Sequence, residues 1–476
     1  MSHIATVNGA AVSPSEAAVD ELRMQVRGAV LTPGDSGQDA VRGAFNAMHA
    51  SRPAITVRPT GTADVVAAIN FARANGLTVC IRGGGHSIAG LSAIEGGMLL
   101  DLAGMDGVHV DAERRRVVAQ GGALWGDVDH ETQAFGLVAP GGVVSDTGVA
   151  GLTLGGGYGW VRRKYGLSVD SLVEAQVVTA DGVVRRAAED ENPDLLWALK
   201  GGGGNFGVVT SFEFALQPLG PIVAFSATMY PIEEIEQVLR GFRDFTSTAP
   251  DEVTSVVVTM TFPANPEMPE VIHDREVAIV GAVYVGDAEK GLEITKPLRE
   301  LGNALFDMSG PTPFTVVQTG FDALFPRDTL RAYWKSQYLD ELSDDAIKLL
   351  ADRARNRPAP LTLVNTFHMG GAIAKVDPEA TAFSERSAPY MVSIDGMWAD
   401  PADDADTIAW VRSAWEAISA YGNGGVYLNF TGLADEEAMS AGVDSALGRN
   451  LERLRKVKAT YDPDNFFRVN NNILPA

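Results

Sequence analysis

Glycine is the residue that most constrains the fold of this chain. The 476 residues include 51 glycines, about 11%, against roughly 7% in ordinary proteins, and the excess is crowded between Gly83 and Gly207. The runs are IRGGGHSIAG at 81–90, GVAGLTLGGGYG at 148–159 and KGGGGNFGVVTSFEF at 200–214. Because glycine has no side chain, the backbone in these runs can approach another group closely. The sequence therefore predicts a binding surface built largely from main chain.

The first glycine run has the form of an anion-binding turn. It follows the apolar strand pattern at 78–82, and consecutive glycines after a strand let backbone N–H groups converge on an anion without help from Lys or Arg. A pyrophosphate would suit this turn. The third run contains the spacing G-x-G-x-x-G at 202–207, but a helical pattern precedes it and a strand pattern follows it. That order is the reverse of the Rossmann fingerprint, so we expect no Rossmann domain.

Length and charge exclude several classes of protein. The chain exceeds the roughly 250–300 residues at which single cores stop growing, so we expect two or more packed units. A net charge of -23 disfavours nucleic acid and anionic lipid surfaces as partners. No window reaches the roughly 18 apolar residues of a membrane span, and the first residues lack a basic segment followed by a long apolar stretch. We therefore expect a cytoplasmic protein.

No metal site is expected either. The single cysteine, Cys80, can form neither an intramolecular disulfide nor a multi-cysteine metal site, and its apolar surroundings predict a buried strand residue. The acidic cluster at 400–406 is typical of a solvated helix start, where the helix dipole favours negative charge. We find no set of metal ligands in the sequence.

Periodicity divides the chain near residue 219. Residues 52–219 alternate short strand patterns with glycine turns and two helical patterns, at 62–75 and 124–135, and a further helix is expected at 15–30. After the segment 218–221 the glycine runs stop, and long strand patterns predict an antiparallel sheet covered by helices. The strands expected in the first unit are 78–82, 98–101, 116–120, 174–179 and 207–216; those of the second are 253–262, 276–286, 361–369 and 390–398, before a helix at 404–421.

Five motifs together carry a resemblance to a known family. They are RGGGHS, TGVAGLTLGGGYG, RRKYGLSVD, GGGGNFGVVTSFEF and the terminal YDPDNFFRVNNNI. In this order and spacing the chain resembles the berberine bridge enzyme-like FAD-linked oxidases of the vanillyl-alcohol oxidase superfamily. The resemblance implies an α+β protein with a PCMH-type FAD-binding domain formed from both chain ends, and an inserted substrate domain. The implied divisions are an N-terminal helical segment at 1–47, the FAD domain at 48–218, the substrate domain at 219–425 and a returning segment at 426–476.

The same resemblance implies a covalent cofactor. His86 lies where the family bonds a histidine nitrogen to the 8α-methyl carbon of the flavin, and a neutral imidazole is a good nucleophile near pH 7. Many relatives add a second bond from a cysteine, but the matching residue here is Val144, which has no sulfur. We therefore expect FAD held by a single covalent bond. A histidine that merely caps a turn is the alternative.

Other positions match family residues that contact FAD. In several of them a glycine could instead serve only a turn, and the two asparagines could cap the terminus. Alternate residues of an extended strand share a face, so the pair Asn470 and Asn472 is expected to hydrogen-bond the flavin ring edge. The expected cofactor-binding residues are Arg82, Gly83, Gly84, Gly85, His86, Ser87, Thr147, Gly148, Gly151, Gly207, Asn470 and Asn472.

Three residues are candidates for catalysis. Tyr158 and Tyr427 match tyrosines that face the substrate side of the flavin in relatives, although each could simply be a buried, packed side chain. A tyrosine is a poor base at its usual pKa near 10, so it would need a positive neighbour or a carboxylate. Asp395 is the best carboxylate candidate, on a strand where it shares a face with Ser393. Phe430 lies where the carbohydrate oxidases of the family have a second tyrosine. The resemblance therefore gives less support for a sugar substrate.

The resemblance implies oxidation of a small molecule. A hydride would pass from an alcohol, amine or phenolic substrate to the flavin, while a base takes the substrate proton. Molecular oxygen would then regenerate the flavin and release hydrogen peroxide, since the compact Thr147 leaves space for oxygen. Two alternatives stay open: a dehydrogenase that uses a quinone or another acceptor, and a non-catalytic protein that binds flavin or another small molecule.

Overall fold

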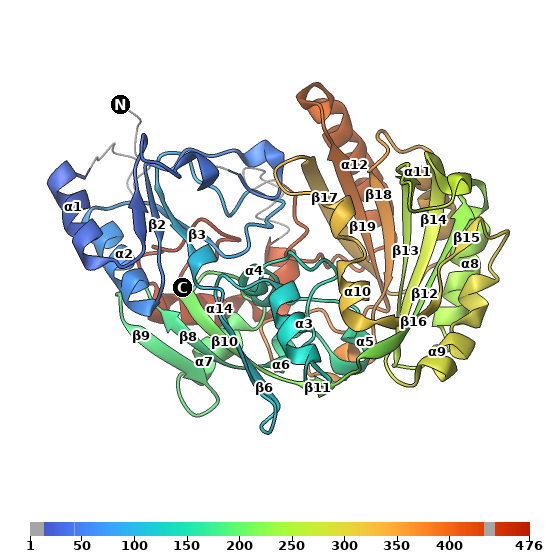
Figure 1. Ribbon diagram of the computed structural model, residues 1–476, viewed down its shortest axis with the longest axis horizontal. Coiled ribbons are helices and arrows are strands. Elements are labelled where there is room, and N and C mark those ends of the chain that lie inside the picture. Colours follow the sequence, from blue (N-terminus) through green and yellow to red (C-terminus); the bar gives the residue numbers. More distant parts are fainter. Residues whose placement is uncertain (1–13, 42, 433–442) are drawn as a thin grey trace.

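Two lobes make up the molecule, and the chain visits the first of them twice. The computed structural model describes residues 14–41, 43–432 and 443–476. Figure 1 shows the first half of the chain in one lobe, a broad sheet with its helices in the other, and the last segment of the chain back beside the first half. The sequence-based segments at 1–47 and 426–476 therefore fall partly outside the described residues.

A small mixed sheet follows the N-terminal helix α1 (Glu16–Gln25). Its order is β1-β2-β4-β3, with β1 antiparallel to β2 and the other pairs parallel. Helix α1 is shorter than expected because the Asp64 carboxylate accepts hydrogen bonds from the amides of Arg27 and Gly28, both at 3.0 Å, and the chain continues into β1. The further elements are β1 (Ala29–Leu31), β2 (Ile55–Arg58), α2 (Thr62–Ala74), β3 (Val79–Arg82) and β4 (Met98–Asp101).

A five-stranded antiparallel sheet completes the strands of this lobe. Its order is β5-β6-β10-β8-β9, and the strands expected at 116–120, 174–179 and 207–216 are confirmed within two residues at each end. The elements are β5 (Val108–Asp111), β6 (Arg116–Gln120), α3 (Trp125–Gln133), β7 (Leu137–Val138), α4 (Val149–Leu154), α5 (Arg162–Tyr165), α6 (Ser168–Ser171), β8 (Leu172–Val178), β9 (Val184–Ala188), α7 (Pro193–Leu199), β10 (Val208–Ala215) and β11 (Gln217–Pro218), the last paired with β7.

The second lobe contains an eight-stranded sheet. Its order is β15-β12-β14-β13-β18-β19-β17, with β16 also paired to β12. The strands expected at 253–262 and 390–398 have those bounds in the structure. The elements are β12 (Ile222–Pro231), α8 (Ile235–Thr246), β13 (Val253–Phe262), β14 (Arg275–Tyr284), α9 (Ala288–Ile294), β15 (Phe306–Asp307), β16 (Gly310–Pro313), α10 (Phe314–Thr319), β17 (Arg331–Leu339), α11 (Asp344–Arg355), β18 (Leu363–His368), β19 (Tyr390–Trp398) and α12 (Asp404–Ser419).

The two faces of this sheet bury different sets of side chains. On β13, Val257 packs into the cluster formed with α8, α11 and α12, whereas Val256 and Val258 belong to the cluster shared with the first lobe. Successive strand residues point to opposite faces, so the sheet has helices on one side and the first lobe on the other. Figure 1 shows α8 on the outer side of these strands, away from the first lobe. The inner face is where a site can form.

The last part of the chain is anchored in the first lobe. Helix α14 (Leu451–Tyr461) packs against α7. The fully buried Lys458 ammonium donates hydrogen bonds to the carbonyls of Asn205 and Phe467, each at 2.8 Å, and to Asp462 at 2.6 Å. The Asp462 carboxylate accepts in turn from the amides of Phe466 and Phe467 at 2.7 and 2.8 Å. This network holds the terminal segment against the third glycine run.

The described residues contain neither a membrane-spanning helix nor a metal-binding cluster. No helix there combines the length and the apolar character needed to cross a membrane. Within the same residues, no three His, Cys, Asp or Glu side chains come together as a set that could hold a metal ion.

Candidate active site

A cavity lies between the two lobes and has two unlike walls. It spans about 2100 Å³ of empty space, a volume that includes open solvent at its mouth. Backbone of the glycine runs at 83–85, 148–151 and 203–207 forms one wall, and side chains of β13, β17, β18 and β19 form much of the other. Such a cavity can take an extended ligand along the glycine wall and a smaller one against the sheet.

The glycine wall is tight where its first two runs meet. A Cβ added to Gly84 would lie 2.5 Å from the amide nitrogen of Gly148, so neither glycine can carry a side chain without moving backbone. Gly85 has a φ of +72°, a conformation that side chains disfavour. The turn therefore needs glycine for both reasons, and it delivers His86 to the cavity directly after β3.

His86 is held by neighbours from three distant segments. Its ring stacks on Phe45 with centroids 3.9 Å apart. Its Nε2 lies 3.3 Å from Oδ1 of Asp146, close enough for an ion pair but not aligned as an ordinary hydrogen bond. Asp146 in turn accepts a 2.6 Å hydrogen bond from Nε of Arg327. The imidazole is thus fixed in place, and it lines the cavity.

Most of the expected cofactor-binding residues share this wall. Gly83, Gly84, Gly85, His86, Ser87, Thr147, Gly148, Gly151 and Gly207 all line the cavity. Arg82 is not part of the lining; its guanidinium donates to the carbonyls of Val41 at 2.7 Å and Ser92 at 2.9 Å. The Arg82 side chain therefore shapes the turn from behind.

The structure corrects the expectation for one of the two terminal asparagines, Asn472. Asn470 and Asn471 line the cavity, whereas Asn472 is exposed and outside it. The expected alternation fails because the segment forms no strand; its course is set by Asn205, which donates to the Asn471 carbonyl and accepts from the amide of Ile473, both at 2.9 Å. The side-chain oxygens of Asn470 and Asn471 are buried without a hydrogen-bond partner in the described structure.

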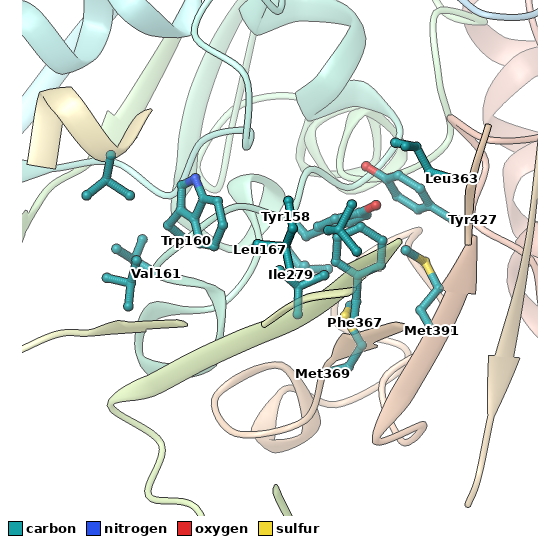
Figure 2. Packing of buried hydrophobic residues seen from close by; sticks show 14 of the residues in the cluster. Tyr158, Trp160, Val161, Leu167, Ile279, Leu363, Phe367, Met369, Met391 and Tyr427 are labelled. Atoms are coloured by element: carbon teal, nitrogen blue, oxygen red, sulfur yellow. The ribbon is translucent and has the colours of Figure 1, made fainter. Parts of the chain in front are cut away.

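Tyr158 and Tyr427 lie side by side at the end of the cavity nearest the sheet, which is the substrate end. Their ring centroids are 4.9 Å apart, and Phe367 packs 5.2 Å from Tyr158; Figure 2 shows the three rings together. The Tyr427 oxygen accepts hydrogen bonds from the Gly157 amide at 3.1 Å and from Asn429 Nδ2 at 2.8 Å. With both lone pairs engaged, its remaining capacity is to donate its proton.

Burial makes both tyrosines poor bases. It raises the pKa of Tyr427 to about 12, against the opposing effect of the hydrogen bonds from Asn429 and Gly157. It raises the pKa of Tyr158 well above its usual value, and the neighbouring Tyr427 and Asp395 add to that effect. The Tyr158 hydroxyl is buried with no hydrogen-bond partner in the described structure, so it can still bond to a ligand.

Asp395 has the properties of a base at neutral pH. It lies on the inner face of β19, opposite Trp334 of β17 and Leu363 of β18. Burial raises the pKa of Asp395 to about 7, although hydrogen bonds from Ser393 and Asn365 act in the other direction. Asn365 Nδ2 donates to Asp395 at 2.6 Å. A carboxyl whose pKa lies near the working pH can both accept and release a proton.

Of the cationic residues after Tyr158, Arg162 lies against the tyrosine ring, and its charge only partly opposes the rise in the Tyr158 pKa. The Arg162 guanidinium lies 5.7 Å from the Tyr158 ring centroid and donates to the carbonyls of Gly159, Ser255 and His368 at 2.8 to 3.1 Å. His368 itself does not line the cavity, and burial lowers its pKa to about 2. These groups brace the sheet against the first lobe.

The rest of the substrate end is aromatic and aliphatic. Trp160 stacks on Phe321 with centroids 5.7 Å apart, and Trp334 meets Phe430 edge to face at 5.1 Å. The indole N–H groups of Trp160 and Trp334 are buried without a hydrogen-bond partner in the described structure. Phe325, Leu324, Leu363, Val256 and Val258 complete this lining.

The glycine wall fits FAD. Gly151 and Gly204 line the cavity, and a Cβ at either would meet nothing within 4 Å, so a ligand can lie directly on the backbone there. The partnerless oxygens of Asn470 and Asn471 can accept hydrogen bonds from a ring N–H. His86, Thr147 and Gly148 lie along the same wall.

Two family models match the two ends of the chain. An FAD binding domain model covers residues 53–188, and a berberine and berberine like model covers residues 426–474. The chain therefore carries an FAD binding domain and a berberine and berberine like segment, and it resembles the berberine bridge enzyme-like FAD-linked oxidoreductases. An FAD-linked oxidoreductase of Dictyostelium discoideum is 28% identical over 96% of this chain and 97% of the relative. (R)-6-hydroxynicotine oxidase of Paenarthrobacter nicotinovorans is 29% identical, over 95% and 98%.

A solved structure extends the match to the fold. The crystal structure of 6-hydroxy-D-nicotine oxidase from Arthrobacter nicotinovorans superposes with a TM-score of 0.84 at 26% identity, covering 95% of this chain and 98% of the other. The expected fold, an α+β protein with a PCMH-type FAD domain from both ends and an inserted substrate domain, is confirmed. The protein is thus an FAD-dependent oxidoreductase, which removes the non-catalytic alternative.

Sequence reasoning missed several residues of the site. Asn365, Asp146 and Arg327 each contact an expected residue directly, yet none lies in a motif. For Asn365 the only signal was a carboxamide within the strand pattern expected at 361–369, and its register with Ser393 of β19 became visible only in the structure. Nothing in the sequence pairs Asp146 with Arg327, because the two are joined only when the lobes pack.

Proposed function

We propose that this protein is an oxidase that moves a hydride from an alcohol, amine or phenolic small molecule to FAD bonded to His86, and that dioxygen then takes the electrons as hydrogen peroxide. One observation carries the proposal: an aromatic cavity opens onto the glycine wall and holds, at its sheet side, a buried carboxyl with a pKa of about 7. Bound FAD supplies the ring that accepts the hydride.

The cofactor is held by backbone and by one covalent bond. Gly83–Ser87, Thr147, Gly148, Gly151 and Gly207 supply the wall on which FAD lies, and Asn470 and Asn471 supply acceptors for its ring edge. The single bond is to His86. Val144 also lines the cavity, and its isopropyl group offers no atom for a second bond.

Asp395 is the proposed catalytic base. In its ionised form it removes the proton from the substrate hydroxyl or amine while the hydride leaves the adjacent carbon. Asn365 and Ser393 hold the carboxyl in position through their hydrogen bonds. Tyr427 and Tyr158 act as hydrogen-bond donors toward the substrate, because their raised pKa values keep both hydroxyls protonated. Both roles are compatible with neutral pH, at which the tyrosines are protonated and the ionised form of Asp395 is accessible.

The cavity favours a compact, largely apolar substrate. A sugar would place several hydroxyl groups against Phe325, Leu363 and Val256, where they would find no hydrogen-bond partner, and an unpaired buried polar group is costly. The free indole N–H groups of Trp160 and Trp334 suit one or two oxygen or nitrogen acceptors instead. A relative whose name gives 6-hydroxynicotine as its substrate and oxidase as its activity supports this class.

Anaerobic reduction followed by exposure to air tests the proposal. The yellow enzyme is mixed without oxygen with a panel of aryl alcohols, aromatic amines, phenols and oligosaccharides, and flavin absorbance is followed. We expect bleaching by an aromatic member of the panel, then recovery in aerated buffer with one hydrogen peroxide per flavin. Slow recovery in air with fast recovery by a quinone would show a dehydrogenase, and bleaching by oligosaccharides alone would contradict the substrate class.

A further inference from the structure

The surroundings of His86 contain a charged pair that the oxidation reaction does not use. Asp146, in the turn before α4, faces the Nε2 side of the imidazole at 3.3 Å. Arg327, from the second lobe, faces the opposite side of the Asp146 carboxylate, with Nε 2.6 Å from Oδ2. Its other nitrogens donate to the carbonyl of Asp146 and, at 2.5 Å, to that of Gly84. Arg327 thus connects both turns that flank His86.

The pair keeps a negative charge beside the imidazole. Burial alone would raise the pKa of Asp146, but the contact with His86 and the charge and hydrogen bond of Arg327 outweigh it and lower the pKa below its usual value. The carboxylate is therefore ionised at neutral pH. Phe45 stacks on the ring face at 3.9 Å, and this contact favours the orientation in which the imidazole faces Asp146.

We infer that Asp146 and Arg327 are positioning residues for the covalent attachment of FAD at His86. A carboxylate beside one imidazole nitrogen favours the tautomer that carries the proton on that nitrogen. An ionised Asp146 favours the proton on Nε2, which leaves the lone pair on Nδ1 free to attack. The inference rests on the proposed function in one respect: His86 must be the attachment residue.

The attachment step balances with dioxygen as the oxidant. One C–N bond forms between Nδ1 and the 8α-methyl carbon, and one C–H bond of that methyl breaks. The hydrogen from the methyl, the hydrogen originally on the imidazole and the electron pair pass to the flavin ring, and dioxygen removes both hydrogens with two electrons as hydrogen peroxide. While the new bond forms, the imidazole carries positive charge, and the Asp146 carboxylate stabilises that charge.

Arg327 gives the second lobe a part in cofactor attachment. It lies in the segment between α10 and β17, where Asp322 also binds the first lobe through the Ser145 amide at 2.9 Å and the Ser145 hydroxyl at 2.5 Å. Asp322 does not contact His86 in the described structure. The segment therefore offers a matched pair of substitutions. Arg327 contacts Asp146, which faces His86, whereas Asp322 contacts Ser145, the residue before Asp146.

The test measures covalent bond formation separately from FAD binding. Wild type, Asp146→Asn, Asp146→Glu, Arg327→Gln and Asp322→Asn are purified from riboflavin-limited cells and incubated with FAD. Total bound flavin is read by absorbance, and covalent flavin by fluorescence of the denatured band. We expect Asp146→Asn to form the bond at least ~100-fold more slowly while still binding FAD, Arg327→Gln to be intermediate, Asp146→Glu to recover part of the rate, and Asp322→Asn to match wild type.

The attachment rates distinguish the positioning role of Asp146 and Arg327 from the attachment at His86 itself. Attachment at the wild-type rate in both Asp146→Asn and Arg327→Gln would overturn the inference, as would a flavin-peptide linked through Nε2 when examined by nuclear magnetic resonance. Equal slowing in Asp322→Asn would also overturn it, because the effect would then belong to lobe contact in general. If Asp146→Asn does not bind FAD, the Arg327→Gln rate decides. A wild-type protein without covalent flavin would refute the proposed attachment at His86 itself.

Discussion

The two walls of the cavity recognise ligands by opposite means. On the first wall, glycine turns present backbone with no side chains in the way, and Gly84 and Gly148 are packed too closely to carry any. On the second wall, strands of a flat sheet present alternating side chains, and the recognition groups are Asp395, Asn365 and a set of aromatic rings. Backbone recognition suits a cofactor whose structure never changes, whereas side chains can be exchanged without disturbing the strands that carry them.

This difference predicts where substitutions act. Changes in the glycine wall should affect cofactor binding or the fold, and changes in the sheet wall should affect the reaction with substrate. His86 and Asp395 are the extreme cases on each side.

Removing the imidazole should abolish attachment. In His86→Ala no nucleophile lies at the flavin methyl, so the denatured protein band should show no flavin fluorescence, whereas wild type should fluoresce. Proteolysis of wild type should yield one flavin-peptide, containing His86, since Val144 cannot form a second bond. A second flavin-linked peptide from any other segment would contradict the single linkage.

Neutralising the carboxyl of the sheet wall should slow the reaction with substrate. Asp395→Asn should reduce the rate of anaerobic flavin reduction by roughly 10²–10⁴, the usual contribution of a general base. In wild type this rate should rise with pH through about 7, the pKa of Asp395, because only the ionised carboxylate accepts a proton. Rapid-mixing spectrophotometry across pH 5 to about 9 measures both effects; a pH profile that survives in Asp395→Asn would exclude Asp395 as the base.

The same carboxyl should make stability depend on pH. Burial raises its pKa in the folded state to about 7 above the roughly 3.9 of an unfolded chain, so the folded protein binds the extra proton between these values. The stability contributed by that proton is complete below about pH 4 and is lost as pH rises through about 7. Asp395→Asn should flatten this part of the melting temperature profile, measured with bound FAD.

Substitutions at two glycines should separate an effect on the stability of the fold from an effect on FAD affinity. Gly84→Ala places a Cβ 2.5 Å from backbone nitrogen of Gly148, so it should lower the melting temperature even without cofactor. Gly151→Ala meets no protein atom within 4 Å and lies inside α4, where alanine favours the helix by roughly 0.5–1 kcal/mol. It should preserve the melting temperature of the flavin-free protein and weaken FAD binding about tenfold. Equal FAD affinity in Gly151→Ala would show that FAD does not lie on this backbone.

The smallest effect is expected for oxygen access. Thr147→Leu adds bulk at the cavity wall, so it should slow the return of flavin absorbance in aerated buffer while leaving anaerobic reduction nearly unchanged. Thr147→Ser, which adds no bulk, is the matched control. Equal slowing of both half-reactions in Thr147→Leu would show that this residue does not limit oxygen access.

The sequence predicted one wall better than the other. The glycine wall could be located because its constraint is local: a turn that needs φ near +72° at Gly85 can be recognised from its residues. The sheet wall needed the register of three strands, and only the period of two along β19, which places Ser393 and Asp395 on one face, was visible. The hydrogen bond from Asn365 depends on which strand pairs with β19.

The remaining errors have a common physical origin. The first helix was predicted too long because Asp64, far along the chain, binds the amides of Arg27 and Gly28. Asn472 was placed on the wrong side because Asn205 determines the course of the terminal segment. In both cases a side chain distant in sequence satisfies backbone groups, and local periodicity contains no information about such contacts. Attachment at His86, oxygen as acceptor and the limits of the domains stay predictions.

The buried contact between Lys458 and the Asn205 carbonyl joins the end of the chain to the third glycine run. The cavity can therefore be completed only after nearly the whole chain has been synthesised. Synthesis proceeds at roughly 5–20 residues per second, so the turn at 83–85 leaves the ribosome tens of seconds before the segment at 467–471 that completes the cavity. Until then the nascent chain exposes an incomplete flavin groove. Cofactor capture is therefore a late event in the maturation of each molecule, and flavin supply can limit the yield of active protein without limiting translation.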